Sequence, residues 1–124
     1  MSSRLRQLDR TATLLLVLFS AGHGFAGTLA ARPFLEPYTV WSFSGSLAAW
    51  AIAGLNWLRA GRPGDRALAA WALGGNLAWA GLMVWLAFAA EMTRDVRIYL
   101  FLVVCAVLAA FSLRDLRARP DRRA

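Results

Sequence analysis

Residues 41–57 read WSFSGSLAAWAIAGLNW, an apolar segment in which small and polar residues recur down one side. Side chains spaced at steps of four and three share one face of an α-helix. This face consists of Ser42, Ser46, Ala49, Ala53 and Asn56. Small residues let a neighbouring backbone approach closely, so we expect other helices to pack against this face. The rings of Phe43, Trp50 and Trp57 recur at steps of seven on another side, where we expect them to meet lipid or a partner helix.

The composition is typical of a membrane protein. The chain of 124 residues is 59% hydrophobic and only 17% charged, against about 25% charged residues in soluble domains, and its mean hydropathy is +0.49. A membrane-spanning helix needs about 20 mainly apolar residues. Four uncharged runs meet or approach this length, at residues 11–31, 38–58, 67–90 and 98–113. We therefore predict an all-α fold, an integral membrane bundle of four transmembrane helices that forms a single domain over residues 1–124.

The connections between these runs predict an up-down-up-down bundle. Residues 32–37 read RPFLEP, and the two prolines bias the chain away from helix there. Residues 59–66 read RAGRPGDR, with the turn-forming pair Pro63 and Gly64. Because both connections are short, consecutive helices are expected to be antiparallel neighbours.

The arginines predict the orientation. All 14 basic residues are arginine, and only Arg32, Arg94 and Arg97 lie beside the first and third connections. The others precede the first run, lie between the second and third runs, or follow the fourth in the tail of residues 114–124. The positive-inside rule then places both termini in the cytoplasm, and compactness with arginine bias suggests a multi-pass protein of a bacterial inner membrane. Scattered arginines beside a membrane suit the anionic headgroups of the lipid bilayer, so we expect no nucleic-acid partner.

The first run carries its own packing face. Ser20 and Gly24 form a small-xxx-small pair, and Gly27 follows on the same side, so close helix contact is expected there. The run LLLVLF and the small residues after it also resemble a signal peptide. We interpret the segment as the first membrane helix.

Four polar residues are expected near the middle of the membrane: His23, Ser46, Asn76 and Cys105. A polar or ionisable group at that depth is costly unless it is paired, which marks it as a functional candidate. His23, Ser46 and Asn76 are therefore our candidate ligand or pathway residues, with Ser46 or Asn76 as the partner of the histidine. The alternative is that these groups only hold helices together through interhelical hydrogen bonds.

The sequence gives little support for a metal site or for an enzyme. His23 lies between two glycines that leave space for a haem edge, but a second axial ligand would have to come from another chain. One histidine and one cysteine fall short of the three or four protein ligands of zinc, so we expect no metal site. There is no carboxylate pair at membrane depth, no Ser-His-Asp set and no glycine-rich phosphate loop, so we expect no enzyme.

Two functions fit these observations. The first is an accessory or structural subunit of a larger membrane complex, which holds a lipid, a quinone or another apolar cofactor between its helices. Its partners would be other membrane subunits or further copies of itself. The alternative is a small oligomeric transporter, or a flippase for lipid-linked substrates, with His23 in the pathway. In length and four-span topology the chain is similar to the small multidrug resistance proteins, but His23 is the ionisable group of its first run where their pattern has a glutamate.

The chain also contains an internal echo. Residues 47–54 read LAAWAIAG and residues 68–75 read LAAWALGG, and each is soon followed by an asparagine, Asn56 or Asn76. An inverted duplication of the kind found in transporters would produce such an echo. The high frequency of alanine, leucine and tryptophan explains it equally well.

Overall fold

The computed structural model describes residues 3–27 and 36–118, and in these residues the chain is all-helical, with four long helices and no strand. The helices are α1 (Ser3–Ala21), which continues into the π-helical turn η1 (Gly22–Gly27), then α3 (Pro37–Gly61), α4 (Arg66–Ala89) and α5 (Val96–Arg117). The predicted all-α class is confirmed. Most of the proline-bracketed connection at residues 32–37, and the last residues of the first predicted run, lie outside the described residues.

Local sequence explains where three of these helices begin. Pro37 is the first residue of α3, a position where its missing N–H costs nothing. Asp65 caps α4 by accepting a hydrogen bond from the Leu68 backbone N–H at 3.0 Å. Asp95 caps α5 by accepting one from the Arg97 backbone N–H at 2.9 Å. Gly64, with a φ of 95°, makes the turn before Asp65 possible.

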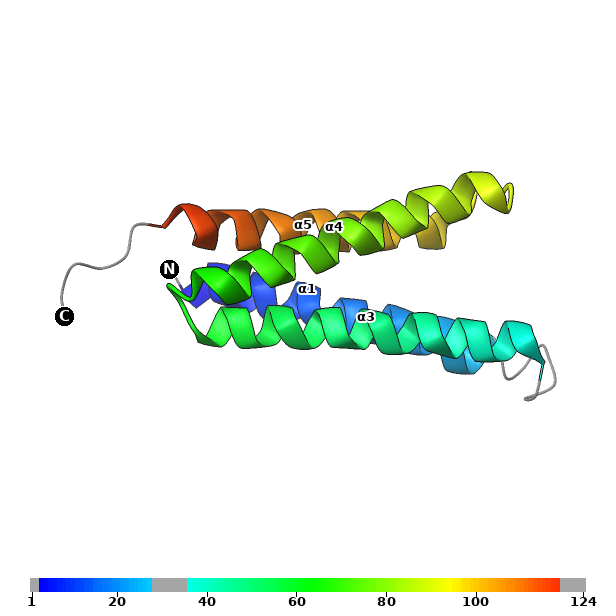
Figure 1. Cartoon of the computed structure of the whole chain (residues 1–124), viewed down its shortest axis with the longest axis horizontal. Helices are drawn as coiled ribbons and strands as arrows, with labels where there is room; N and C mark the ends of the chain where they lie inside the picture. Colours follow the sequence, from blue (N-terminus) through cyan, green and yellow to red (C-terminus); the bar gives the residue numbers. More distant parts are fainter. Residues whose placement is uncertain (1–2, 28–35, 119–124) are drawn as a thin grey trace.

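The helices form two antiparallel hairpins, α1 with α3 and α4 with α5 (Figure 1). The contact between α4 and α5 is the most extensive, while α1 also packs on α5 and α3 on α4. Within the described residues α1 and α4 make no contact, so they lie diagonally across the bundle. The neighbour order around the bundle is therefore α1, α3, α4, α5.

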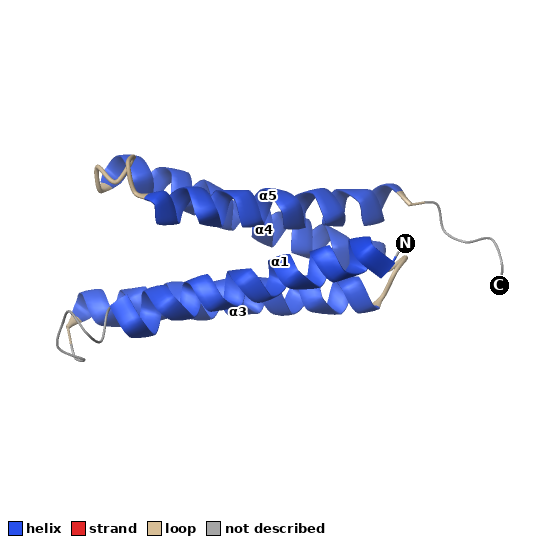
Figure 2. Cartoon of the chain, turned by 180° about the vertical axis from the view of Figure 1, so that it is seen from behind, coloured by secondary structure: helices blue, strands red, loops and turns tan. Residues whose placement is uncertain are grey.

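The two ends of the bundle differ. The start of α1, the connection at residues 62–65 and the end of α5 lie together at what we call the arginine-rich end (Figure 1). The opposite end carries η1, the start of α3 and the connection at residues 90–95. The hairpins converge at the arginine-rich end and diverge toward the opposite end in both views (Figures 1 and 2).

Small side chains fill the region where the hairpins converge. Ala49 and Ala53 of α3 and Cys105 of α5 are buried in one core with Leu16 and Leu108. The small and polar face of α3 is buried throughout, with exposed fractions of at most 2% for Ser42, Ser46, Ala49, Ala53 and Asn56. Because those side chains are small, helices from both hairpins can approach α3 closely.

Two helices, α4 and α5, are long and apolar enough to cross a membrane, with mean hydropathies of 1.5 and 2.4 over their best windows. Within the described residues, α1 and α3 do not meet the same criterion. The first turns of α1 carry charged residues, Asp9 among them. In α3 the serines and Asn56 lower the mean hydropathy. Ser42, Ser46 and Asn56 are nevertheless buried inside the bundle.

Candidate functional site

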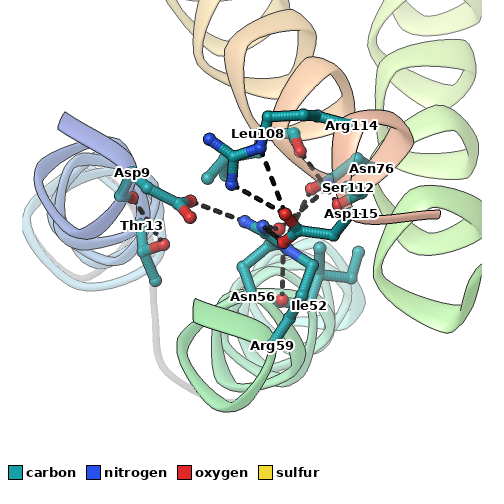
Figure 3. Close-up of polar contacts among 10 residues, drawn as sticks. All are labelled: Asp9, Thr13, Ile52, Asn56, Arg59, Asn76, Leu108, Ser112, Arg114 and Asp115. Carbon is teal, nitrogen blue, oxygen red and sulfur yellow. Dashed lines mark hydrogen bonds and ion pairs between the residues drawn. The ribbon is translucent and has the colours of Figure 1, made fainter. Parts of the chain in front are cut away.

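A buried arginine joins three helices near the arginine-rich end (Figure 3). Arg59 of α3 is 1% exposed, and its Nη2 donates to Oδ1 of the fully buried Asp9 of α1 at 2.5 Å. Its Nη1 donates to Oδ2 of Asp115 of α5 at 2.7 Å. Arg114 pairs with the other oxygen of Asp115, with Nη2 at 2.7 Å. We call Asp9, Arg59, Arg114 and Asp115 the ion cluster.

The ion cluster is balanced in charge but not fully hydrogen-bonded. Two carboxylates face two guanidiniums, so the cluster carries no net charge when all four are ionised. Among the described residues, however, Asp9 Oδ2 and Arg59 Nε are buried without a hydrogen-bond partner. Burial raises the pKa of Asp9 above its ordinary value of 3.8, against the opposing effect of the Arg59 guanidinium. Keeping Asp9 ionised in this place therefore costs free energy.

An asparagine pair lies next to the ion cluster. Asn56 Nδ2 donates to Asn76 Oδ1 at 3.0 Å, and Asn76 Nδ2 donates back to Asn56 Oδ1 at 3.1 Å (Figure 3). Both side chains are fully buried, and Arg59 Nη2 lies 3.5 Å from the same Asn56 oxygen. The pair joins α3 to α4, as the bond from Arg59 to Asp115 joins α3 to α5. Two polar contacts therefore hold the hairpins together near one end.

A cavity of about 290 Å³ lies between the hairpins, toward the opposite end. Its walls are mainly apolar and come from every helix; they include Phe101 of α5 together with His23, Ser46, Ala48 and Trp79. The Trp79 ring is 93% buried, and its Nε1–H has no hydrogen-bond partner among the described residues. This arrangement suits an apolar molecule more than an ion or a strongly polar substrate.

The wall beside His23 is built by close contact between η1 and α3. Ser46 Oγ donates to the Ser20 backbone oxygen at 2.8 Å, and a Cβ added to Gly24 would lie 2.2 Å from that Oγ. A side chain at position 24 would therefore displace this hydroxyl. His23 lies in the π-helical turn, a widened form of helix that often occurs at functional sites.

An ion pair lies at the edge of the cavity. Asp95 and Arg97 both line it, and their side chains are joined by bonds from Arg97 Nε of 2.9 and 3.0 Å to the two carboxylate oxygens. The Arg97 guanidinium holds the pKa of Asp95 below its usual value. Because Arg97 is 62% exposed, the pair is solvated and contributes little to stability.

The structure separates the three candidate ligand or pathway residues. His23 and Ser46 line the cavity, whereas Asn76 lies outside it and pairs with Asn56. Of the residues expected in helix packing, Ser20 and Ser42 also line the cavity, and Ala49 and Ala53 lie in the core. Gly27 ends η1, and its surroundings lie outside what the structure describes.

Sequence reasoning missed the ion cluster because it assigned Arg59 to a connection. A signal was present: Arg59 follows Asn56 by three residues and so continues the polar face of α3. Asp9 likewise precedes Thr13 by four residues, and Asp115 follows Ser112 by three, and both of these hydroxyl residues are buried. Extending each buried face past the end of the uncharged run would have found all three.

Comparisons of the chain with protein-family models, with curated proteins and with solved structures find no match.

Proposed function

We propose that the chain is a four-span protein of a bacterial inner membrane, with both termini in the cytoplasm. The hydropathy of α4 and α5 supports a membrane location. The arginines that precede the first run, lie between the second and third runs and follow the fourth support the orientation. The outer surface supports it as well: Trp71, Trp85 and Phe88 of α4 are 70–73% exposed. Large exposed rings on one helix are a liability in water and are stabilised in lipid or against a partner.

We further propose that the bundle holds an apolar molecule between its hairpins, as an accessory subunit of a membrane complex. The cavity carries this proposal. Its volume of about 290 Å³ is at the lower limit of small-molecule pockets, about 300 Å³. It is roughly twice the cavity of about 150 Å³ that accommodates benzene. A single ring with substituents, such as a quinone head, or part of a lipid chain would fit there.

Native mass spectrometry of the gently extracted protein tests this function. The expected result is one or two copies of the chain with a retained lipid or quinone mass, or with a larger foreign subunit. Ala48→Phe, which places a ring in the cavity, should abolish the retained mass. Ala51→Phe is the matched control, because Ala51 is also exposed on α3 but does not line the cavity. Equal retention in both variants would refute the cavity as the site.

One observation favours transport as a second candidate. The cavity lies where the hairpins diverge, while the ion cluster and the asparagine pair hold them together at the other end. A transporter needs such one-sided access to a central site. Under this alternative the protein would be a homo-oligomer without a retained ligand. His23→Ala would then abolish transport while leaving folding intact, whereas an accessory subunit would keep its partner in that variant.

A further inference from the structure

We propose that the bond between Arg59 and Asp115 is a latch, which keeps the arginine-rich end closed while the molecule in the cavity enters and leaves at the opposite end. This inference rests on the proposed function of the cavity. It concerns how access to that cavity is controlled. The bond connects the two hairpins, because Arg59 belongs to α3 and Asp115 to α5.

The remaining members of the ion cluster position the latch. Asp9 lies on α1, in the same hairpin as Arg59, and holds Nη2 so that Nη1 faces α5. Arg114 holds the other oxygen of Asp115 from within α5 itself. Each partner of the latch is thus held by a neighbour of its own hairpin. The hairpins can separate there without either charge losing every partner.

The position of the latch relative to the cavity supports control of access. Between the two lies a layer of closely packed small and medium side chains, including Ala53, Leu16 and Leu108, each at most 2% exposed. Such packing seals the bundle only while the hairpins stay together at that end. The Asn56–Asn76 pair, which joins α3 to α4, is the second contact that must slide or break when they separate.

The hydrogen bonding of the ion cluster is incomplete on the Asp9 side of the latch. Each unsatisfied polar group in a buried ion pair costs free energy. Here Asp9 Oδ2 and Arg59 Nε lack partners in the described residues.

Distance measurements between spin labels test the latch. In a Cys105→Ala background, one label pair at Gly61→Cys and Arg117→Cys reports on the arginine-rich end. Both positions are exposed, and a Cβ at Gly61 meets no atom within 4 Å. A second pair at Val40→Cys and Thr93→Cys reports on the opposite end, and neither position lines the cavity. Each pair places one label on each hairpin.

Asp115→Asn should add a longer distance population for the 61–117 pair and a shorter one for the 40–93 pair. Asp65→Asn is the matched control, because asparagine caps a helix as well as aspartate does and Asp65 lies at the same end without touching Arg59. Its distances should equal those of wild type. Asp115→Glu keeps the negative charge, so its 61–117 distances should equal those of wild type. A general loss of folding caused by substitution at position 115 would not explain that recovery.

Unchanged 61–117 distances in folded Asp115→Asn would overturn the latch. If Asp115→Asn does not fold, the double variant Arg59→Met with Asp9→Asn decides instead, because it removes the bond to Asp115 and leaves no uncompensated charge at position 9; unchanged distances there would also overturn the latch. Native mass spectrometry of the same variants separates the two proposals. A ligand retained by wild type and lost in Asp115→Asn supports the latch, whereas no retained ligand with the predicted distance change refutes only the proposed function.

Discussion

Replacing Arg59 by methionine is the sharpest perturbation of this fold. Methionine nearly matches arginine in length but leaves Asp9, which is fully buried, without a guanidinium. Asp115 is less affected, because it is 15% exposed and keeps Arg114. Breaking a buried pair by removing one partner costs about 3–5 kcal/mol. The loss at Asp9 should account for most of this, so Arg59→Met should reduce the folded-to-unfolded ratio by roughly two to three and a half orders of magnitude.

The free energy of unfolding can be measured by titrating a denaturing detergent into mild micelles and following far-ultraviolet circular dichroism. Arg62→Met is the control: Arg62 is exposed at the same end, so its change should stay within about 0.5 kcal/mol. Adding Asp9→Asn to Arg59→Met should recover most of the lost stability, because no uncompensated charge then remains. A cost below about 1 kcal/mol for Arg59→Met, or no recovery in the double variant, would refute the energetic role given to the cluster.

Three further substitutions test separate features. Gly24→Ala should destabilise the bundle by about 1–3 kcal/mol, since the new Cβ would overlap Ser46, whereas Gly22→Ala, with no atom within 4 Å, should be near neutral in the same titration. Trp79→Phe should stay within about 1 kcal/mol of wild type, because it removes a buried N–H that lacks a partner; a larger loss would mean that this N–H is bonded. Burial raises the pKa of Asp9 in the folded state above its ordinary value of 3.8. The contribution of protonated Asp9 to stability is therefore complete below pH 3.8 and is lost as the pH rises through the pKa of the folded state. Wild type should therefore lose stability relative to Asp9→Asn over that window, and a difference that does not change with pH would show that the native pKa is not raised.

The sequence predicts much of this fold because the buried side chains of a helix recur at steps of three and four residues. The all-α class and the four helices follow from uncharged runs and short connections. Steps of three and four along α3 mark side chains that the structure buries, from Ser42 to Asn56. The pattern cannot give the neighbour order, because both circular orders of four antiparallel helices would bury the same faces.

The cavity could not be predicted for a related reason. His23 and Ser46 are marked as polar groups at depth, but whether they face a cavity depends on how far the two hairpins diverge. That divergence depends on contacts between side chains of different hairpins, such as Phe19 of α1 with Phe101 of α5 at a centroid distance of 6.0 Å. Distances of this kind between helices are not encoded in the periodicity of either helix alone.

The ion cluster shows where the assumption behind membrane-span prediction fails. A search for uncharged runs ends each run at the first charge, so it places Asp9, Arg59 and Asp115 outside the bundle. A charge one or two residues beyond a run can still turn inward when its helix continues, and α1, α3 and α5 all extend past their runs at this end. Inward burial then requires opposite charges at the same level on neighbouring helices, which only the assembled bundle provides. The two asparagines that follow residues 47–54 and 68–75 also pair with each other only in the assembled bundle, across α3 and α4 and next to the buried arginine.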